Sequence, residues 1–308
     1  MQIRTDLAVE SRGLKQKPSG VTVTRLHHGN VEEIQVAVET EDAARMLEKA
    51  RGTYITLYHP LLSHADAKER LEMIHALADA LKKLLPPFGD ILVIGLGNRY
   101  MTADALGSRV VESLLITRHV KAVINESVSN RLRSVCAATP GVLGITGIET
   151  AEMVRGIAEH VRPSAIIAID ALAARESSRI CTTIQVTDTG ILPGSGVGNH
   201  REGLTKETLG MPVIAIGVPM VVYAAVIARD ALSLLLDDLG ISEEEHEQAI
   251  EGMVQKITRQ GLGELVVTPR EVDELVGKVA RIIADGVNLA LQTDLSEEEI
   301  QMFSHDEL

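Results

Sequence analysis

Two aspartates follow short aliphatic runs that are typical of buried strands. Asp170 comes directly after the run 165–169, and Asp104 lies in the loop that follows the run 91–94. In an open parallel sheet, groups beyond the carboxyl ends of the strands share one crevice. Two carboxylates that lie close share one proton, so one acts as an acid and the other as a base. This pair predicts that the site activates a water molecule for attack on an amide bond. The alternative is that Asp104 caps a helix and that Asp170 accepts hydrogen bonds from loop amides.

Glycine-rich loops supply further candidates for substrate contact. Residues 188–200 hold four glycines, and residues 139–150 lead into a helical pattern whose first N–H groups are free to hold an oxyanion. Glycine lets the backbone approach a ligand closely, because it carries no Cβ atom. For each candidate the alternative is an ordinary turn residue, helix cap or surface charge. The candidates for substrate binding are Asn98, Arg99, Glu149, Arg175, Ser195 and His200.

Several familiar catalytic motifs are absent from the sequence. Gly95-Leu96-Gly97 is followed by Tyr100 where the dinucleotide fingerprint needs a third glycine. There is no Gly-Lys-Ser/Thr phosphate loop and no Gly-x-Ser-x-Gly nucleophile elbow. Ile250 stands where a zincin that began at His246 would need its second histidine. These absences disfavour nucleotide-binding enzymes, serine hydrolases and zincins.

The surrounding pattern predicts the elements that position these side chains. Continuous aliphatic runs at residues 91–94, 165–169 and 213–216 are typical of strands buried on both faces of a parallel sheet. Strand and helix in alternation indicate a doubly wound, mostly parallel α/β sheet sandwiched by helices. Alternating residues around His28-Gly29-Asn30 predict an N-terminal β-hairpin, and Pro219 is expected to open a helix. The predicted helices cover residues 63–85, 103–119, 149–161 and 219–239.

Composition narrows the class of protein. The 308 residues carry 30 basic and 43 acidic side chains, a net charge of −13, which disfavours a surface for nucleic acid. Six aromatic residues are too few for base stacking or a membrane belt, and prolines interrupt the long uncharged stretch 211–228. The only cysteines, Cys136 and Cys181, fit neither a disulfide framework nor a thiolate metal site. We therefore expect a cytoplasmic globular protein that binds neither nucleic acid nor a membrane.

Taken together, the motifs closely resemble those of the germination proteases of spore-forming bacteria, peptidase family A25. Many short motifs match in the same order, and they cover almost the whole chain. They are Ile3-Arg4-Thr5-Asp6-Leu7-Ala8-Val9-Glu10, Gly95-Leu96-Gly97-Asn98, Asp104-Ala105-Leu106-Gly107, Pro140-Gly141-Val142, Thr146-Gly147-Ile148-Glu149-Thr150, Ala168-Ile169-Asp170-Ala171-Leu172-Ala173-Ala174-Arg175, Asp188-Thr189-Gly190-Ile191, Pro193-Gly194-Ser195-Gly196-Val197-Gly198-Asn199, Glu207-Thr208-Leu209-Gly210 and Val267-Thr268-Pro269.

The resemblance implies a fold and an activity. The family fold is a phosphorylase/hydrolase-like α/β sandwich related to the hydrogenase maturation proteases. Its members are atypical aspartic endopeptidases that need no cofactor, form homotetramers and cleave small acid-soluble spore proteins in the spore core at germination. Their two essential aspartates lie in the Asp-Ala-Leu-Gly and Ile-Asp-Ala-Leu-Ala-Ala-Arg motifs, which implies catalytic roles for Asp104 and Asp170.

Family members are also made as zymogens that remove a leader at a site resembling that of their substrate. The substrate site is Thr-Glu, then Ile or Phe, then Ala-Ser-Glu, and the cut follows the first Glu. The stretch from Thr5 to Glu10 keeps the acid, the apolar residue, the alanine and the final glutamate of this pattern. We therefore expect self-cleavage between Asp6 and Leu7, a propeptide of residues 1–6 and a single peptidase domain of residues 7–308.

Two alternatives remain open at the level of sequence. In the first, Asp104, Asp170 and His200 hold a cation, as the acidic and histidine ligands of related maturation proteases do, and the chain is a metallopeptidase. In the second, the chain binds small acid-soluble spore proteins without cleaving them.

Overall fold

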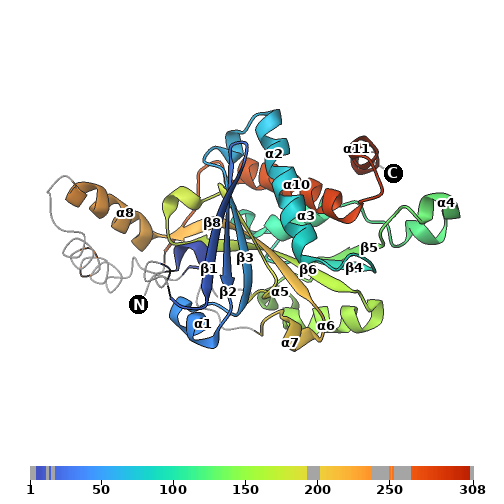
Figure 1. The fold of residues 1–308 in the computed structure, drawn as a ribbon, viewed down its shortest axis with the longest axis horizontal. Helices are drawn as coiled ribbons and strands as arrows, with labels where there is room; N and C mark the ends of the chain where they lie inside the picture. Colours follow the sequence, from blue (N-terminus) through green and yellow to red (C-terminus); the bar gives the residue numbers. More distant parts are fainter. Residues whose placement is uncertain are drawn as a thin grey trace.

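A sheet forms the centre of the molecule, with nine strands among the residues that the structure describes (Figure 1). The computed structural model describes residues 5–11, 14, 18–192, 202–237, 250, 252 and 265–305. The strands follow the order β1-β2-β3-β7-β8-β6-β4-β5, and β9 pairs with β8. Their bounds are β1 (Val21–His28), β2 (Val31–Val38), β3 (Gly52–Tyr58), β4 (Ile91–Gly95), β5 (Val135–Ala138), β6 (Ala165–Ala174), β7 (Thr183–Thr187), β8 (Val213–Tyr223) and β9 (Val266–Val267).

Strands β8, β6, β4 and β5 form the parallel part of the sheet. The aliphatic runs of the sequence are the three inner strands of this part. β4 is buried along its whole length, and β6 is buried except at Ala171. Burial on both faces requires apolar residues at consecutive positions, which is why these strands read as continuous runs. The predicted α/β class with parallel strands is confirmed.

The other half of the sheet is antiparallel, and it includes the predicted hairpin. β1 and β2 pair around the two-residue turn Gly29-Asn30, with Val23 opposite Val36. Gly29 has a φ of 60°, which glycine adopts without a Cβ penalty. β2 then pairs with β3, β3 with β7, and β7 with β8, so the hairpin extends the sheet from the parallel half.

Helices cover both faces of the sheet (Figure 1). α2, α3 and α10 lie on one face, in the larger core cluster, and α6 packs on the other face against β4 and β6. In the described ranges, no helix is both long enough and apolar enough to cross a membrane. The helices are α1 (Glu41–Leu47), α2 (Ala67–Leu84), α3 (Leu106–Glu112), α4 (Glu126–Ser129), α5 (Leu143–Thr146), α6 (Thr150–Val161), α7 (Lys206–Leu209), α8 (Ala224–Asp237), α10 (Val272–Leu291) and α11 (Glu297–His305).

The prediction that Pro219 opens a helix is wrong. β8 runs through Pro219 to Tyr223, and α8 begins only at Ala224. A proline is tolerated in an inner strand where pairing is irregular, and here the β6–β8 register shifts between Leu172 and Ala173, next to Pro219.

Two other predicted boundaries also differ from the structure. The helix expected at residues 103–119 is limited to α3, because a 3-10 turn at Thr102–Asp104 precedes it and its cap lies at Ser113. β6 continues to Ala174, so Asp170 lies within a strand rather than directly after one. The extra residues of β6 pair with the long strand β8, which the sequence pattern had ended too early.

Candidate active site

Asp170 lies on β6 at the point where its neighbour β4 stops. Gly95, the last residue of β4, pairs with Ile169, so Asp170 is the first residue of β6 beyond the end of β4. Asp170 is 6% exposed, and its Oδ1 atom accepts a hydrogen bond from Ala171 N at 2.9 Å. Asp170 therefore lies where the sequence predicts it, at the carboxyl end of β4, although it is still within β6.

Asp104 ends the 3-10 turn η4 (Thr102–Asp104), between β4 and α3. Its Oδ2 atom accepts a hydrogen bond from Asn98 N at 2.8 Å. Gly97 has a φ of 94°, and a Cβ atom built there would lie 2.0 Å from the carbonyl oxygen of Asp104. The Gly-Leu-Gly-Asn motif thus brings the backbone against the Asp104 turn, where a residue with a side chain would collide.

The segments that carry the two aspartates lie against each other. Leu96 N donates to the carbonyl oxygen of Ile169 at 2.8 Å, and a Cβ atom at Gly107 would lie 2.5 Å from that same oxygen. The η4 turn also contacts β6 and β8. Gly107 therefore explains the glycine of the Asp-Ala-Leu-Gly motif, because only glycine allows the start of α3 to approach the residue before Asp170.

Two of the substrate-binding candidates have ordinary local roles. Asn98 Oδ1 accepts from Tyr100 N at 3.0 Å, which is the side-chain turn expected as the alternative. Arg99 is exposed, and its guanidinium lies 3.5 Å from a carboxylate oxygen of Glu112.

Of the remaining candidates, the structure describes two. Glu149 is the N-cap residue of α6, but its side chain makes no capping hydrogen bond. Arg175 follows β6 and lines the cavity described below. Ser195 and His200 lie outside the described residues.

The segment that contains the predicted cleavage site is docked onto the end of β6. Asp6 N donates to the carbonyl oxygen of Ala173 at 3.3 Å, and Ala173 N donates to Asp6 Oδ2 at 3.0 Å. The acidic side chain before the predicted cut is thus bound by a main-chain amide. Because this donor is a main-chain N–H, no sequence pattern could have identified it.

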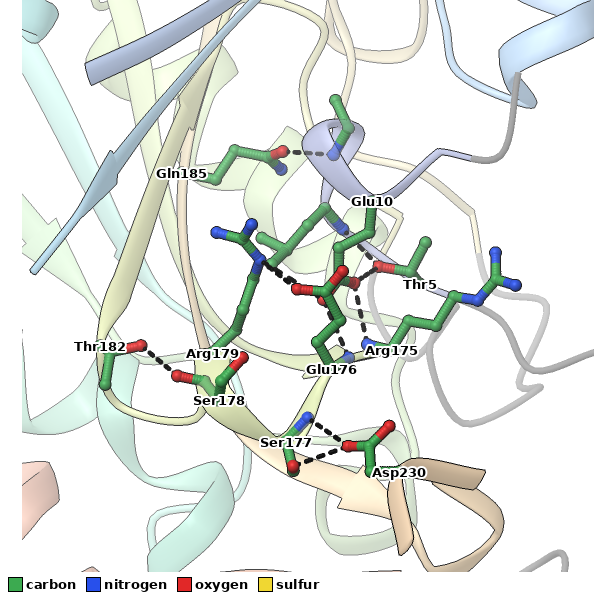
Figure 2. A network of polar contacts seen from close by, with 12 residues as sticks. Thr5, Glu10, Arg175, Glu176, Ser177, Ser178, Arg179, Thr182, Gln185 and Asp230 are labelled. Carbon is green, nitrogen blue, oxygen red and sulfur yellow. Dashed lines mark hydrogen bonds and ion pairs between the residues drawn. The ribbon is translucent and has the colours of Figure 1, made fainter. Parts of the chain in front are cut away.

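The carbonyl group of the Asp6–Leu7 bond has two side-chain donors. Lys49 Nζ lies 3.0 Å from Asp6 O, and Gln185 Nε2 lies 3.2 Å from it. The other end of the Gln185 carboxamide accepts a hydrogen bond from Ala8 N at 2.7 Å (Figure 2). Sequence reasoning missed both residues, because neither lies in a motif.

The residues after the predicted cut are buried. Leu7 is 0% exposed and packs in an apolar cluster with Leu172 and Val222. Ala8 is also 0% exposed and packs in a second cluster with Val36 and Leu47. The first position thus holds a large apolar side chain and the second a small one, each fully buried.

Glu10 is buried and anchors the far end of the segment (Figure 2). Its carboxylate accepts from Arg175 N at 2.8 Å and from Glu176 N at 3.0 Å, and it lies 3.7 Å from Arg179 Nε. Thr5 Oγ1 also donates to it. Burial raises the pKa of Glu10, while the hydrogen bonds from Thr5 and Arg175 lower it. Arg175 therefore contributes its amide, while its guanidinium extends away from the Glu10 carboxylate.

A cavity of about 460 Å³ lies beside the docked segment. Its walls include Asp6, Lys49, Leu172, Gln185 and Gly217. The cavity is therefore bounded by the predicted cleavage site, by both carbonyl donors and by the strand next to Asp170.

Asp170 and Gln185 lie in one row across the sheet. Each pairs with Gly217 of β8, which lies between them, so their Cα atoms are roughly 10 Å apart at ordinary strand spacing. Side chains alternate along a strand. The neighbours of Asp170, Gly217 and Gln185 in their strands are Ile169, Ile216 and Val186. All three belong to the core cluster that contains α2 and α10. Asp170 and Gln185 therefore share the opposite face, where the Leu172 side chain covers Gly217: a Cβ atom built on Gly217 would lie 2.3 Å from Leu172 Cδ1.

The described part of the chain holds no cluster of metal ligands. Among those residues, no three His, Cys, Asp or Glu side chains gather closely enough to hold a metal ion. His200, which the metallopeptidase alternative requires, lies outside them.

Comparisons with known proteins agree over nearly the whole chain. The sequence matches the germination protease family, A25, over residues 2–261 and 241–304. Proteins named germination protease from Clostridium perfringens strain 13 and Caldanaerobacter subterraneus subsp. tengcongensis are each 40% identical, over 98% of this chain and 98% of their own. One from Bacillus pumilus is 36% identical, over 99% of this chain and 97% of its own.

Among solved structures, the chain is similar to the [NiFe] hydrogenase maturation protease HycI from Thermococcus kodakarensis. It is 20% identical with a TM-score of 0.30, covering 46% of this chain and 80% of that one. The sequence matches carry the assignment: the chain belongs to the germination protease family and is a peptidase.

Proposed function

We propose that this peptidase is an endopeptidase that starts the degradation of small acid-soluble spore proteins in the spore core at germination. It is made as a zymogen, acts as a homotetramer and cuts its own chain between Asp6 and Leu7. Residues 1–6 are its propeptide, and residues 7–308 are its peptidase domain. The observation that carries the proposal is the docking of the segment from Thr5 to Glu10.

The docked contacts agree with the substrate pattern that the family resemblance implies. The acid before the bond is Asp6, whose carboxylate is bound by Ala173 N. The apolar residue after the bond is Leu7, which is buried in one apolar cluster, and the next position holds Ala8, which is buried in a second cluster. The last acid is Glu10, which is bound by two main-chain amides. Each preference thus has a physical cause in this segment.

We propose that Asp104 and Asp170 share a proton and activate the attacking water. Supporting this role, the η4 turn lies against β6, and Asp170 shares a row and a face of the sheet with the Gln185 that binds the Asp6 carbonyl. In the reaction, water adds to the carbonyl carbon and gives a proton to the ionised aspartate. The protonated aspartate then gives a proton to Leu7 N as the C–N bond breaks. The products are a new carboxyl group and a new amine.

The test uses a peptide that spans Thr-Asp-Leu-Ala-Val-Glu and a small acid-soluble spore protein as substrates. Asp104→Asn and Asp170→Asn should each abolish cleavage of both and leave the melting temperature close to that of the wild type. Asp79→Asn, at a side chain that is 60% exposed, is the matched control and should cleave normally. Mass spectrometry of the products identifies the bond that is cut. Full activity in either active-site variant, or an intact spore protein after incubation with the wild type, would contradict the proposal.

A further inference from the structure

The carbonyl of the Asp6–Leu7 bond receives two donors that come from distant parts of the chain. We propose that Lys49 and Gln185 polarise this carbonyl and hold the oxyanion that forms on it, an inference that rests on the self-cleavage proposed above. Lys49 Nζ and Gln185 Nε2 lie 3.0 and 3.2 Å from Asp6 O. Donors that stabilise a developing oxyanion lie at about 2.7–3.1 Å from it; Lys49 Nζ falls within this range, and Gln185 Nε2 lies just beyond it.

Lys49 is positioned by the end of α1. Glu48 adopts the left-handed conformation, with a φ of 54°, and Lys49 N donates to Ala44 O at 3.1 Å. These contacts end the helix and fix the backbone of Lys49. Its ammonium group donates to Thr5 O at 2.9 Å as well as to Asp6 O, so it bridges two successive carbonyls. The cation is therefore held at the bond by two successive carbonyl oxygens of the segment.

Gln185 is positioned by β7 and oriented by the segment itself. Its Oε1 atom accepts from Ala8 N at 2.7 Å, so its NH₂ group faces the Asp6 carbonyl. One carboxamide thus forms hydrogen bonds with the backbone on both sides of the Asp6–Leu7 bond.

The chemical step places negative charge where these donors point. When water adds to the carbonyl carbon of Asp6, the C=O electron pair moves to the oxygen. The Lys49 ammonium and the Gln185 N–H then bind that oxyanion until the C–N bond breaks and Leu7 N takes a proton. Removing one such donor typically lowers kcat by about 10²–10³-fold.

Charged groups around Lys49 set the pH range in which it is a cation. Burial lowers its pKa, while the carboxylates of Asp6, Glu10 and Glu48 raise it, and burial is the larger effect. Arg175 lines the same cavity and adds to the positive charge there. The rate should therefore fall on the alkaline side at a pH below the ordinary lysine value of 10.5.

The test follows loss of residues 1–6 by intact mass, and docking by the exchange of Asp6 and Ala8 amide hydrogens. Dividing each rate by the docked fraction separates chemistry from undocking. In the docked state, Lys49→Met should cleave its own chain about 100-fold more slowly than the wild type. Lys49→Arg should recover most of the rate. The pH at which the rate of Lys49→Arg falls on the alkaline side should be higher than in the wild type. Gln185→Glu keeps the acceptor for Ala8 N, loses the donor to Asp6 O, and should also slow the cut. Lys68→Met, at a side chain 85% exposed, should be unchanged.

The outcomes separate this inference from the function on which it rests. If docked Lys49→Met and Gln185→Glu cut at the wild-type rate, the role of the two donors is wrong, while self-cleavage stands. If the wild type itself never loses residues 1–6, self-cleavage and the role of the donors are both wrong.

Discussion

Replacing Glu10 tests whether the docked segment is held at its far end as the structure indicates. In Glu10→Ala the amides of Arg175 and Glu176 lose the acceptor that they reach at 2.8 and 3.0 Å. A donor left without a partner costs about 1–3 kcal/mol, and the lower part of that range applies because both residues are half-buried. The loss of both acceptors should therefore destabilise the docked segment by about 3 kcal/mol. The segment should therefore open roughly 100-fold more often, at about 1.4 kcal/mol per tenfold change.

The assay is hydrogen exchange of the Asp6 and Ala8 amides in uncut chain, verified by intact mass. These amides donate to Ala173 O and Gln185 Oε1, so their exchange reports opening of the segment. Glu10→Gln keeps one acceptor oxygen and should lie between Glu10→Ala and the wild type. Exchange in Glu10→Ala that stays within threefold of the wild type would refute the reasoning, because the two hydrogen bonds would then contribute little.

Three further predictions follow from individual contacts. Burial raises the folded-state pKa of Glu10 above 4.5, so protonation of Glu10 favours the folded state. The resulting contribution to the free energy of unfolding is present below pH 4.5 and is lost as pH rises through the folded-state pKa. Acidification should therefore stabilise the wild type relative to Glu10→Gln in urea unfolding, and an equal pH dependence of the two would contradict this. Leu7→Ala should lower the free energy of unfolding of the uncut chain by about 2–5 kcal/mol, whereas Leu61→Ala, 60% exposed, should change it little; equal losses would show that Leu7 is not buried. Gly97→Ala should destabilise the protein more than Gly147→Ala, because both have positive φ but only Gly97 faces Asp104 O at 2.0 Å; equal melting temperatures would contradict that contact.

The parallel strands could be predicted because their environment determines their composition. β4, β6 and β8 are buried on both faces, which requires consecutive aliphatic residues and gives a local signal. β3 was not predicted, because threonine and tyrosine are mixed into it and α1 precedes it closely. Pro219 misled the prediction because its tolerance depends on a shift in register between two strands, which no local pattern records.

The candidate site was predictable only where a motif carries it. The two aspartates stand out because each belongs to a glycine-containing or strand-end motif, and the close approaches at Gly97 and Gly107 explain those glycines. Lys49 and Gln185 carry no such signal. They reach Asp6 across 43 and 179 residues of sequence, so only the folded chain brings them to the Asp6–Leu7 bond.

A crystal structure of the uncut Asp104→Asn chain tests the central claim most directly, because the carboxamide keeps the shape of the carboxyl group. The quantity to measure is the separation of the side chains of residue 104 and Asp170 from one water beside the carbonyl carbon of Asp6. We expect one water within about 3 Å of both side chains and in line with that carbon. The proposed mechanism would be contradicted if the two side chains point in opposite directions, or if the main chain separates them from the Asp6–Leu7 bond.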